Sequence, residues 1–140
     1  MTKLLKNLIL TLALFAIFTG CNKEDDLQEI FTGRNWTLAY IQEGTEKIMP
    51  QESNYAILFE DATFVLTTPN DVRISGKWQA DGGNRKFSCT QITTTGDITE
   101  DKIAQKMEVL LQSTISYEGD ANWLQLITQP GNVFIQFHNR

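Results

Sequence analysis

The sequence predicts an α+β domain, a mostly antiparallel β meander that forms a twisted sheet or partly closed barrel with one α-helix packed on it. After residue 30, apolar and polar residues alternate in short runs separated by Gly, Asn, Asp and Pro, which is typical of half-buried strands joined by turns. Between Ile98 and Gln112 the apolar spacing lengthens to that of a helix. With 140 residues the chain has room for one domain.

About eight of the alternating runs have the length and composition of strands. Residues 60–62 and 69–71 are connections of hairpin length, and the second contains Pro, Asn and Asp, which favour turns. The predicted strands are Trp36–Ile41, Tyr55–Phe59, Thr63–Thr67, Val72–Gln79, Lys86–Ile92, Thr114–Tyr117, Trp123–Thr128 and Val133–Phe137. Such an order of short strands predicts a meandering antiparallel sheet.

The predicted helix has one apolar face. This face is formed by Ile103, Met107, Leu110 and Leu111, whose spacing is that of successive helical turns. Its start is predicted from capping chemistry: either Asp97 with Glu100 three residues later, or Thr99 alone. We therefore expect a helix that packs on the sheet or plugs it.

The first 20 residues read as an export signal. Lys3 and Lys6 precede the apolar stretch Leu8–Phe18, which is too short for a good transmembrane helix and ends in small residues. The segment Phe18-Thr19-Gly20-Cys21 resembles the bacterial lipoprotein cleavage motif, in which the cysteine becomes the lipid-bearing first residue of the mature chain. The sequence thus predicts a signal peptide over residues 1–20 and attachment to the outer membrane through a lipid on Cys21.

Residues 21–30 are predicted to be a flexible tether, with the folded domain at residues 31–140. The segment Lys23-Glu24-Asp25-Asp26 is too charged to pack, so its simplest role is to hold the domain clear of the bilayer. A lysine followed by acidic residues at this place is also similar to the surface-export signal of lipoproteins in the Bacteroides and Flavobacterium group. That resemblance implies a cell-surface location.

Composition excludes several classes of function. Two of the 12 Lys and Arg residues precede Cys21, which leaves 10 against 17 acidic residues and a net charge of −7 on the mature chain. This charge argues against a nucleic-acid partner. Apart from Cys21, the chain has one cysteine, Cys89, and one histidine, His138, which excludes a Cys/His zinc site and a disulfide framework. We expect no enzyme activity, metal or cofactor.

The residues that could act in catalysis or bind a metal or ligand have simpler structural explanations. Cys89 alternates with Phe87 on an inward face, where a free thiol behaves as a small hydrophobe. The acidic pairs Glu60-Asp61 and Glu100-Asp101 lie at a turn and a helix start, where acids are favoured for backbone reasons rather than for acid–base work or calcium binding. The alternating large residues read as core rather than as the lining of a ligand cavity: Ile57, Phe59, Ile74, Trp78, Ile135 and Phe137.

Three residues are candidates for binding a partner. Trp123 is out of phase with Leu124 and Leu126, so either the tryptophan or the leucine pair points away from the core; an outward Trp123 would be the best exposed aromatic contact. Arg73 and Lys77 share the strand face opposite Val72, Ile74 and Trp78. That face suits an acidic partner, or it is simply a charged surface in water.

The order of elements resembles the META/HslJ-like domain of small bacterial outer-envelope lipoproteins. The resemblance runs over Asn35–Leu38, Tyr55–Phe59 and, most clearly, Lys102–Phe137, which includes Ser116-Tyr117-Glu118-Gly119-Asp120 and Gly131-Asn132-Val133. At Gly76-Lys77-Trp78 the sequence departs from that family, which predicts a divergent relative, and is similar to small lipocalin-like lipoproteins.

These resemblances bring no catalytic residue, and they leave the function open. The META/HslJ-like one implies a non-catalytic envelope interaction or stress-related accessory module. The lipocalin-like one implies a carrier of a small apolar ligand, for which eight strands are about enough to enclose one molecule. An inhibitor-type module that docks a loop into an enzyme is a third reading.

Overall fold

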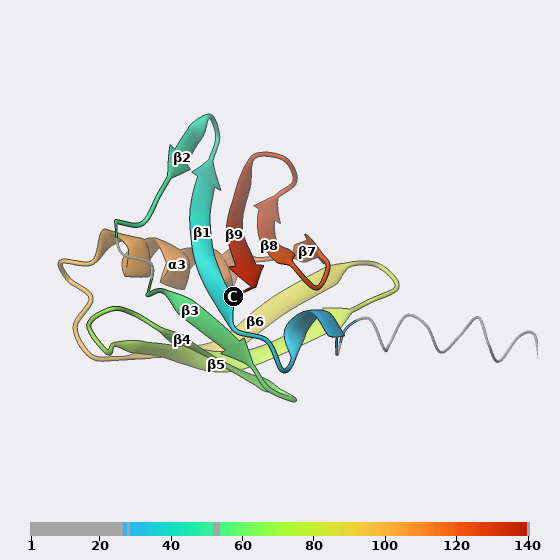
Figure 1. The fold of residues 1–140 in the computed structure, drawn as a ribbon, viewed down its shortest axis with the longest axis horizontal. Helices are drawn as coiled ribbons and strands as arrows, with labels where there is room; N and C mark the ends of the chain where they lie inside the picture. Colours follow the sequence, from blue (N-terminus) through green and yellow to red (C-terminus); the bar gives the residue numbers. More distant parts are fainter. Residues whose placement is uncertain (1–26, 28, 52–53, 140) are drawn as a thin grey trace, which may run out of the picture.

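The computed structural model describes residues 27, 29–51 and 54–139, and it confirms the predicted α+β class. The described residues form nine antiparallel strands in one sheet and one longer helix (Figure 1). The elements are β1 Trp36–Glu43, β2 Glu46–Ile48, β3 Ala56–Phe59, β4 Thr63–Thr67, β5 Arg73–Asp81, β6 Lys86–Thr95, α3 Lys102–Ser113, β7 Ser116–Gly119, β8 Trp123–Gln129 and β9 Val133–Asn139.

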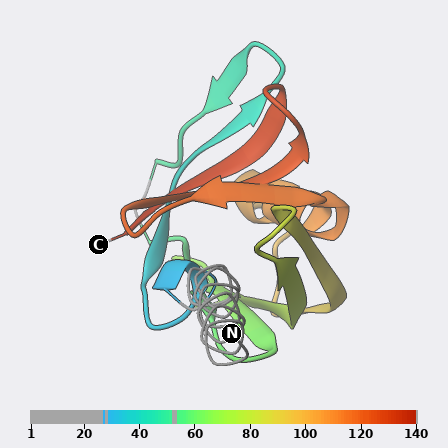
Figure 2. The ribbon, with the colours of Figure 1, turned by 90° about the vertical axis from the view of Figure 1, so that its right-hand side faces the viewer.

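The sheet closes on itself into a ring. Neighbouring strands follow the chain order from β3 to β9, and β1 pairs with β3 on one side and β9 on the other (Figure 2). Leu38 lies opposite Phe137, and Ile41 lies opposite Ile135. The far end of β1 also pairs with β2, which extends beyond the ring. Closure leaves few unpaired strand edges, which otherwise attract other chains.

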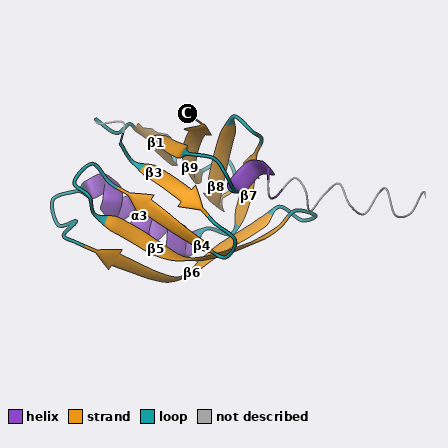
Figure 3. Cartoon of the chain, turned by 60° about the horizontal axis from the view of Figure 1, so that its bottom comes forward, coloured by secondary structure: helices purple, strands orange, loops and turns teal. Residues whose placement is uncertain are grey.

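The weakest junction of the ring lies between β6 and β7. Only one pair of residues, Lys86 and Ser116, is in register there. The rest of β6 has no strand neighbour on this side, so another element has to cover it. Helix α3 lies along this part of the sheet and contacts β6, β8 and β9 (Figure 3). Glu108 of the helix accepts a hydrogen bond from the Thr94 hydroxyl of β6. Its buried residues are Ala104, Met107, Leu110 and Leu111, close to the predicted apolar face.

The N-terminal part of the described chain plugs one end of the ring. Residues 27 and 29–31 are helical, and the Phe31 ring is fully buried. Its centroid lies 5.1, 4.9, 5.3 and 5.0 Å from the ring centroids of Phe59, Trp78, Phe87 and Tyr117. Ile30 is also buried, so the packed domain includes at least one residue of the predicted tether.

The predicted inward faces are confirmed. Val72, Ile74 and Trp78 are buried, whereas Arg73 and Lys77 on the same strand are exposed. All six residues predicted to be core are buried: Ile57, Phe59, Ile74, Trp78, Ile135 and Phe137. Apolar side chains, aliphatic and aromatic, therefore fill the interior of the ring.

Two local predictions were incomplete or wrong. Strand β2 was not predicted, because Glu46-Lys47-Ile48 is too short to show alternation; it forms because Gly44, at φ +62°, turns the chain and Ile48 pairs with Ile41. The predicted N-caps were wrong, since α3 begins at Lys102 and Asp101 is its cap. Asp97 instead accepts the backbone N–H of Thr99 at 2.8 Å, which forms a turn before the helix.

Candidate functional site

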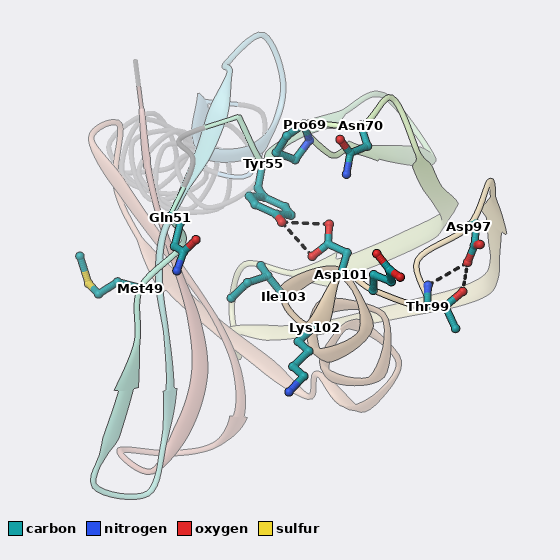
Figure 4. Close-up of a pocket in the computed structure, with 11 residues that line it drawn as sticks. Met49, Gln51, Tyr55, Pro69, Asn70, Asp97, Thr99, Asp101, Lys102 and Ile103 are labelled. Atoms are coloured by element: carbon teal, nitrogen blue, oxygen red, sulfur yellow. Dashed lines mark hydrogen bonds between the residues drawn. The ribbon is translucent and has the colours of Figure 1, made fainter.

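Three connections meet at the end of the ring opposite the Phe31 plug and surround an open hollow of about 820 Å³ (Figure 4). They are the β2–β3, β4–β5 and β6–α3 connections, which lie far apart in sequence. The lining residues are Met49, Gln51, Tyr55, Pro69, Asn70, Asp97, Thr99, Glu100, Asp101, Lys102 and Ile103.

One hydrogen-bonded pair ties two of these connections together. The Tyr55 hydroxyl lies 2.8 and 2.9 Å from the two carboxylate oxygens of Asp101, as Figure 4 shows. The same carboxylate accepts the backbone N–H of Ala104 at 3.0 Å, which caps α3. The Gln105 side chain adds hydrogen bonds to the carbonyls of Ile98 and Thr99 at 2.7 and 2.8 Å. This wall is thus held in place before any ligand arrives.

The lining is polar and carries a negative balance. The lining contains three carboxylates, those of Asp97, Glu100 and Asp101, and one cation, Lys102. Hydrogen bonds from the Thr99 side chain and backbone N–H lower the pKa of Asp97, so this carboxylate is charged at neutral pH. Among the residues that the structure describes, no three His, Cys, Asp or Glu side chains gather as a metal site would need. The hollow therefore suits polar or basic groups of a partner.

The Cys89 thiol and the His138 imidazole lie on strands that are not neighbours in the sheet. Cys89 is buried on β6, as the alternation predicts, and burial raises its pKa to about 12. Because the thiolate is the reactive form, this thiol is a poor nucleophile at neutral pH. His138 lies on β9, where it pairs with Trp123 of β8. Strands β6 and β9 are not neighbours, so the fold does not build a cysteine–histidine pair.

Trp123 is the outward member of its strand. Leu124 and Leu126 are fully buried, while Trp123 is partly exposed on the outer side of the ring. Arg73 and Lys77 are exposed on β5, which β6 and β7 separate from β8. The structure therefore places the three predicted binding residues on two different walls. Lys77 borders a separate surface hollow with Leu27 and Asp61.

The predicted anchor and export residues, Cys21, Lys23, Glu24, Asp25 and Asp26, lie outside the described residues. None of the helices within residues 27, 29–51 and 54–139 is long and apolar enough to cross a membrane. Leu27 lies near Asp61 and Ala62, before β4 begins, whereas Pro69 and Asn70 of the hollow follow the end of β4. Leu27 and the hollow are thus at opposite ends of the ring (Figure 1).

The hollow could not be found from the sequence. Tyr55 and Asp101 are 46 residues apart, and each belongs to a pattern with a local explanation. Tyr55 was part of a predicted strand, and Asp101 was one of two acids near a helix start. Only the closure of the ring brings their connections together.

Comparison with known proteins identifies the family to which the chain is similar. A family model described as a domain of unknown function (DUF4847) matches residues 22–139. A crystal structure of a DUF4847 family protein from Bacteroides vulgatus ATCC 8482 superposes with a TM-score of 0.64 at 23% identity, covering 80% of this chain and 96% of that one. This likeness shows the fold. The comparison with curated proteins finds no match.

The family match corrects the predicted resemblance. The META/HslJ-like assignment was wrong, because the matched model over residues 22–139 is a different family. The residues that carried the resemblance, such as Leu124-Gln125-Leu126, are common in any β meander and do not separate one such family from another. The match likewise takes the place of the lipocalin-like runner-up.

Proposed function

The chain belongs to the DUF4847 family, a domain of unknown function, and from its own residues we propose that it is a non-catalytic lipoprotein of the outer membrane, exposed at the cell surface, that binds a partner through the hollow. The observation that carries the proposal is the position of the hollow at the end of the ring opposite Leu27 and the Phe31 plug. A lipid on Cys21 would hold the plugged end toward the membrane. The polar hollow would then face outward.

Binding rather than catalysis is supported by the chemistry of the side chains. The Cys89 thiol is buried, and the Asp101 carboxylate is occupied by Tyr55 and the start of α3. The interior of the ring is filled by buried aliphatic and aromatic side chains, which weighs against an interior carrier site for a small apolar ligand. A preformed polar hollow on a rigid scaffold instead fits recognition of polar partner groups.

Anchoring is tested by replacing the lipid-bearing residue. Cys21→Ser should leave the precursor uncleaved or the product unanchored, because the lipid is attached through the thiol. Mass spectrometry of protein extracted from membranes checks this. An unmodified Cys21 in the wild-type protein, or cleavage at another residue, would contradict the proposal.

Surface exposure is tested through the charged tether. Replacing Lys23, Glu24, Asp25 and Asp26 by Ala should leave the protein lipidated but protected from a protease added to whole cells. If the variant is as accessible to the protease as the wild type, the segment is a tether without an export role.

The orientation and the binding role are tested with two matched asparagines. Asn70 borders the hollow, whereas Asn84 lies in the β5–β6 turn at the opposite end, and both are exposed. A photo-crosslinking residue placed at position 70 of the lipidated full chain should yield a discrete adduct in intact cells, and one at position 84 should not. Equal adducts at both positions, or none at 70, would contradict binding through the hollow.

A further inference from the structure

A second surface lies on the outer wall of the ring, away from the hollow. Cross-strand register places Gln125 of β8, Gln136 of β9 and Tyr40 of β1 in one row, because directly paired residues share a face of the sheet. The next row contains Ile127, Phe134 and Gln42. On the other side of the first row, Trp123 begins β8 and pairs with His138 of β9. We call six of these residues the amide–aromatic face: Tyr40, Gln42, Trp123, Gln125, Phe134 and Gln136.

All six side chains of the amide–aromatic face are partly exposed. The residues that alternate with them on the same strands point inward and are fully buried, among them Ile41, Leu124 and Ile135. Three aromatic rings therefore lie on the water side of a sheet whose core does not need them. Partly exposed aromatic groups gathered on a surface commonly mark a contact site.

Trp123 differs from the other two tryptophans in its hydrogen bonding. The buried Trp36 and Trp78 donate their indole N–H groups to the carbonyls of Ile30 and Glu60, at 3.0 and 2.7 Å. Within the part of the chain that the structure describes, the Trp123 indole N–H has no such acceptor. It is thus a donor left available to a ligand.

The amide groups offer further donors and acceptors. Gln125 donates from Nε2 to Oε1 of Gln136 at 2.8 Å, which fixes the two side chains against each other. A primary amide has two donors and a carbonyl oxygen with two lone pairs, so this pair retains hydrogen-bonding capacity on the water side. The face thus combines fixed amides with aromatic rings.

The aromatic rings of this face differ in what already covers them. Tyr40 and Phe134 pack edge to face with centroids 6.0 Å apart. The Lys47 ammonium lies 4.1 Å from the centroid of the Tyr40 ring, so one side of that ring is already occupied by a group from the solvent side. A ligand that stacks on this side of the Tyr40 ring has to displace the Lys47 ammonium.

Charge and size indicate the class of ligand. None of the six residues is charged, and the charged residues in register at the two margins, Glu118 beside Gln125 and Lys47 beside Gln42, have opposite signs. The amide–aromatic face with its margins therefore carries no net charge, although the mature chain carries −7, and it suits an uncharged ligand. Three strands about 4.8 Å apart and five residues of about 3.3 Å each span about 240 Å². A stable protein interface needs about 800 Å² on each partner, so the face is too small for one.

We propose that the amide–aromatic face binds a neutral glycan. Sugar rings have apolar C–H faces that stack on Trp123, Tyr40 and Phe134, and hydroxyl groups that exchange hydrogen bonds with the amides of Gln42, Gln125 and Gln136. This inference goes beyond the proposed function and is independent of the hollow, since none of its residues lines the hollow.

The test uses the full chain in detergent on an array of neutral and acidic oligosaccharides, followed by titration with the neutral oligosaccharide that binds best. Trp123→Ala and Gln136→Ala should each weaken binding by about ten-fold or more, the equivalent of one lost stacking or bidentate contact. Trp123→Phe should retain part of the affinity, because it keeps an aromatic ring.

Two control variants separate this surface from others. Leu58→Ala removes an exposed apolar side chain from β3, and Asn70→Ala alters the rim of the hollow; neither should change glycan binding. Failure to bind any neutral oligosaccharide, preference for acidic ones, or binding that survives Trp123→Ala would overturn the proposal. Capture of a protein through Trp123 without glycan binding would also overturn it.

Discussion

The two ends of the ring are closed in different ways. At the plugged end Phe31 lies fully buried against four aromatic rings, so the interior is tightly packed there. At the other end the connections leave a polar hollow, held by the contact between Tyr55 and Asp101. Apolar packing thus stabilises one end of the ring, and the other end can hold polar groups at fixed positions.

The lengths of the connections explain this difference. The β3–β4 and β7–β8 connections at the plugged end span only residues 60–62 and 120–122. A backbone hydrogen bond closes each of them, from Glu60 N–H to the Thr63 carbonyl and from Asp120 N–H to the Trp123 carbonyl. At the hollow end the β2–β3 and β6–α3 connections are longer, so their polar groups need other partners. Side-chain hydrogen bonds supply some of these partners.

The largest effect is expected at the plug. Phe31→Ala should lower the free energy of unfolding by about 3–5 kcal/mol, because it removes a fully buried ring from the aromatic cluster. Urea unfolding of the purified protein measures this change. Asn70→Ala, at the exposed rim of the hollow, should change stability by less than about 0.5 kcal/mol. Similar effects of both variants would remove the proposed difference between the ends.

An intermediate effect is expected at the wall of the hollow. Tyr55→Phe removes the hydroxyl that donates to Asp101, and it should cost about 1–2 kcal/mol, as for a hydrogen bond to a charged group that is partly buried. Asp101→Asn should cost a comparable amount through weaker capping of α3. Unfolding of both single variants and the double variant gives their coupling energy. Strictly additive losses would show that the two side chains do not act together.

Much of the fold could be predicted because its signals are local. The alternation of Val72, Ile74 and Trp78 with exposed residues is a property of one strand, and the structure confirms it. The spacing of Met107, Leu110 and Leu111 likewise predicts the buried face of α3 without reference to the rest of the chain.

The features that could not be predicted depend on distant parts of the chain. Phe31 follows a charged segment and has no alternating neighbours, so only its fit among Phe59, Trp78 and Phe87 reveals it as core. The cap of α3 was misplaced because Asp97, Thr99 and Asp101 all have side chains able to cap, and tertiary contact with Tyr55 favours Asp101. The outward direction of Trp123 needed the burial of Leu124 to be settled.

The smallest effect at neutral pH is expected at Cys89, within the packed wall. Burial raises the pKa of its thiol from 9.0 to about 12 in the folded protein. Below pH 9 the thiol is protonated in both states, so its contribution to stability does not change with pH. Between about pH 9 and pH 12 the unfolded chain loses the proton first, and stability should therefore fall as pH rises. The fall should not exceed about 1.4 kcal/mol per pH unit.

The measurement compares unfolding of Cys21→Ser with that of Cys21→Ser/Cys89→Ser, since serine keeps the shape of the side chain but does not ionise in this range. Other groups titrate equally in both proteins, so the difference in their stabilities isolates the thiol. It should be constant up to about pH 9 and shrink above it. In the Cys21→Ser protein, Cys89 should also resist alkylation until urea unfolds the chain, because only the exposed thiolate reacts. Rapid alkylation of the folded protein would show that the wall around Cys89 is loosely packed. The difference between this wall and the hollow would then be smaller than proposed.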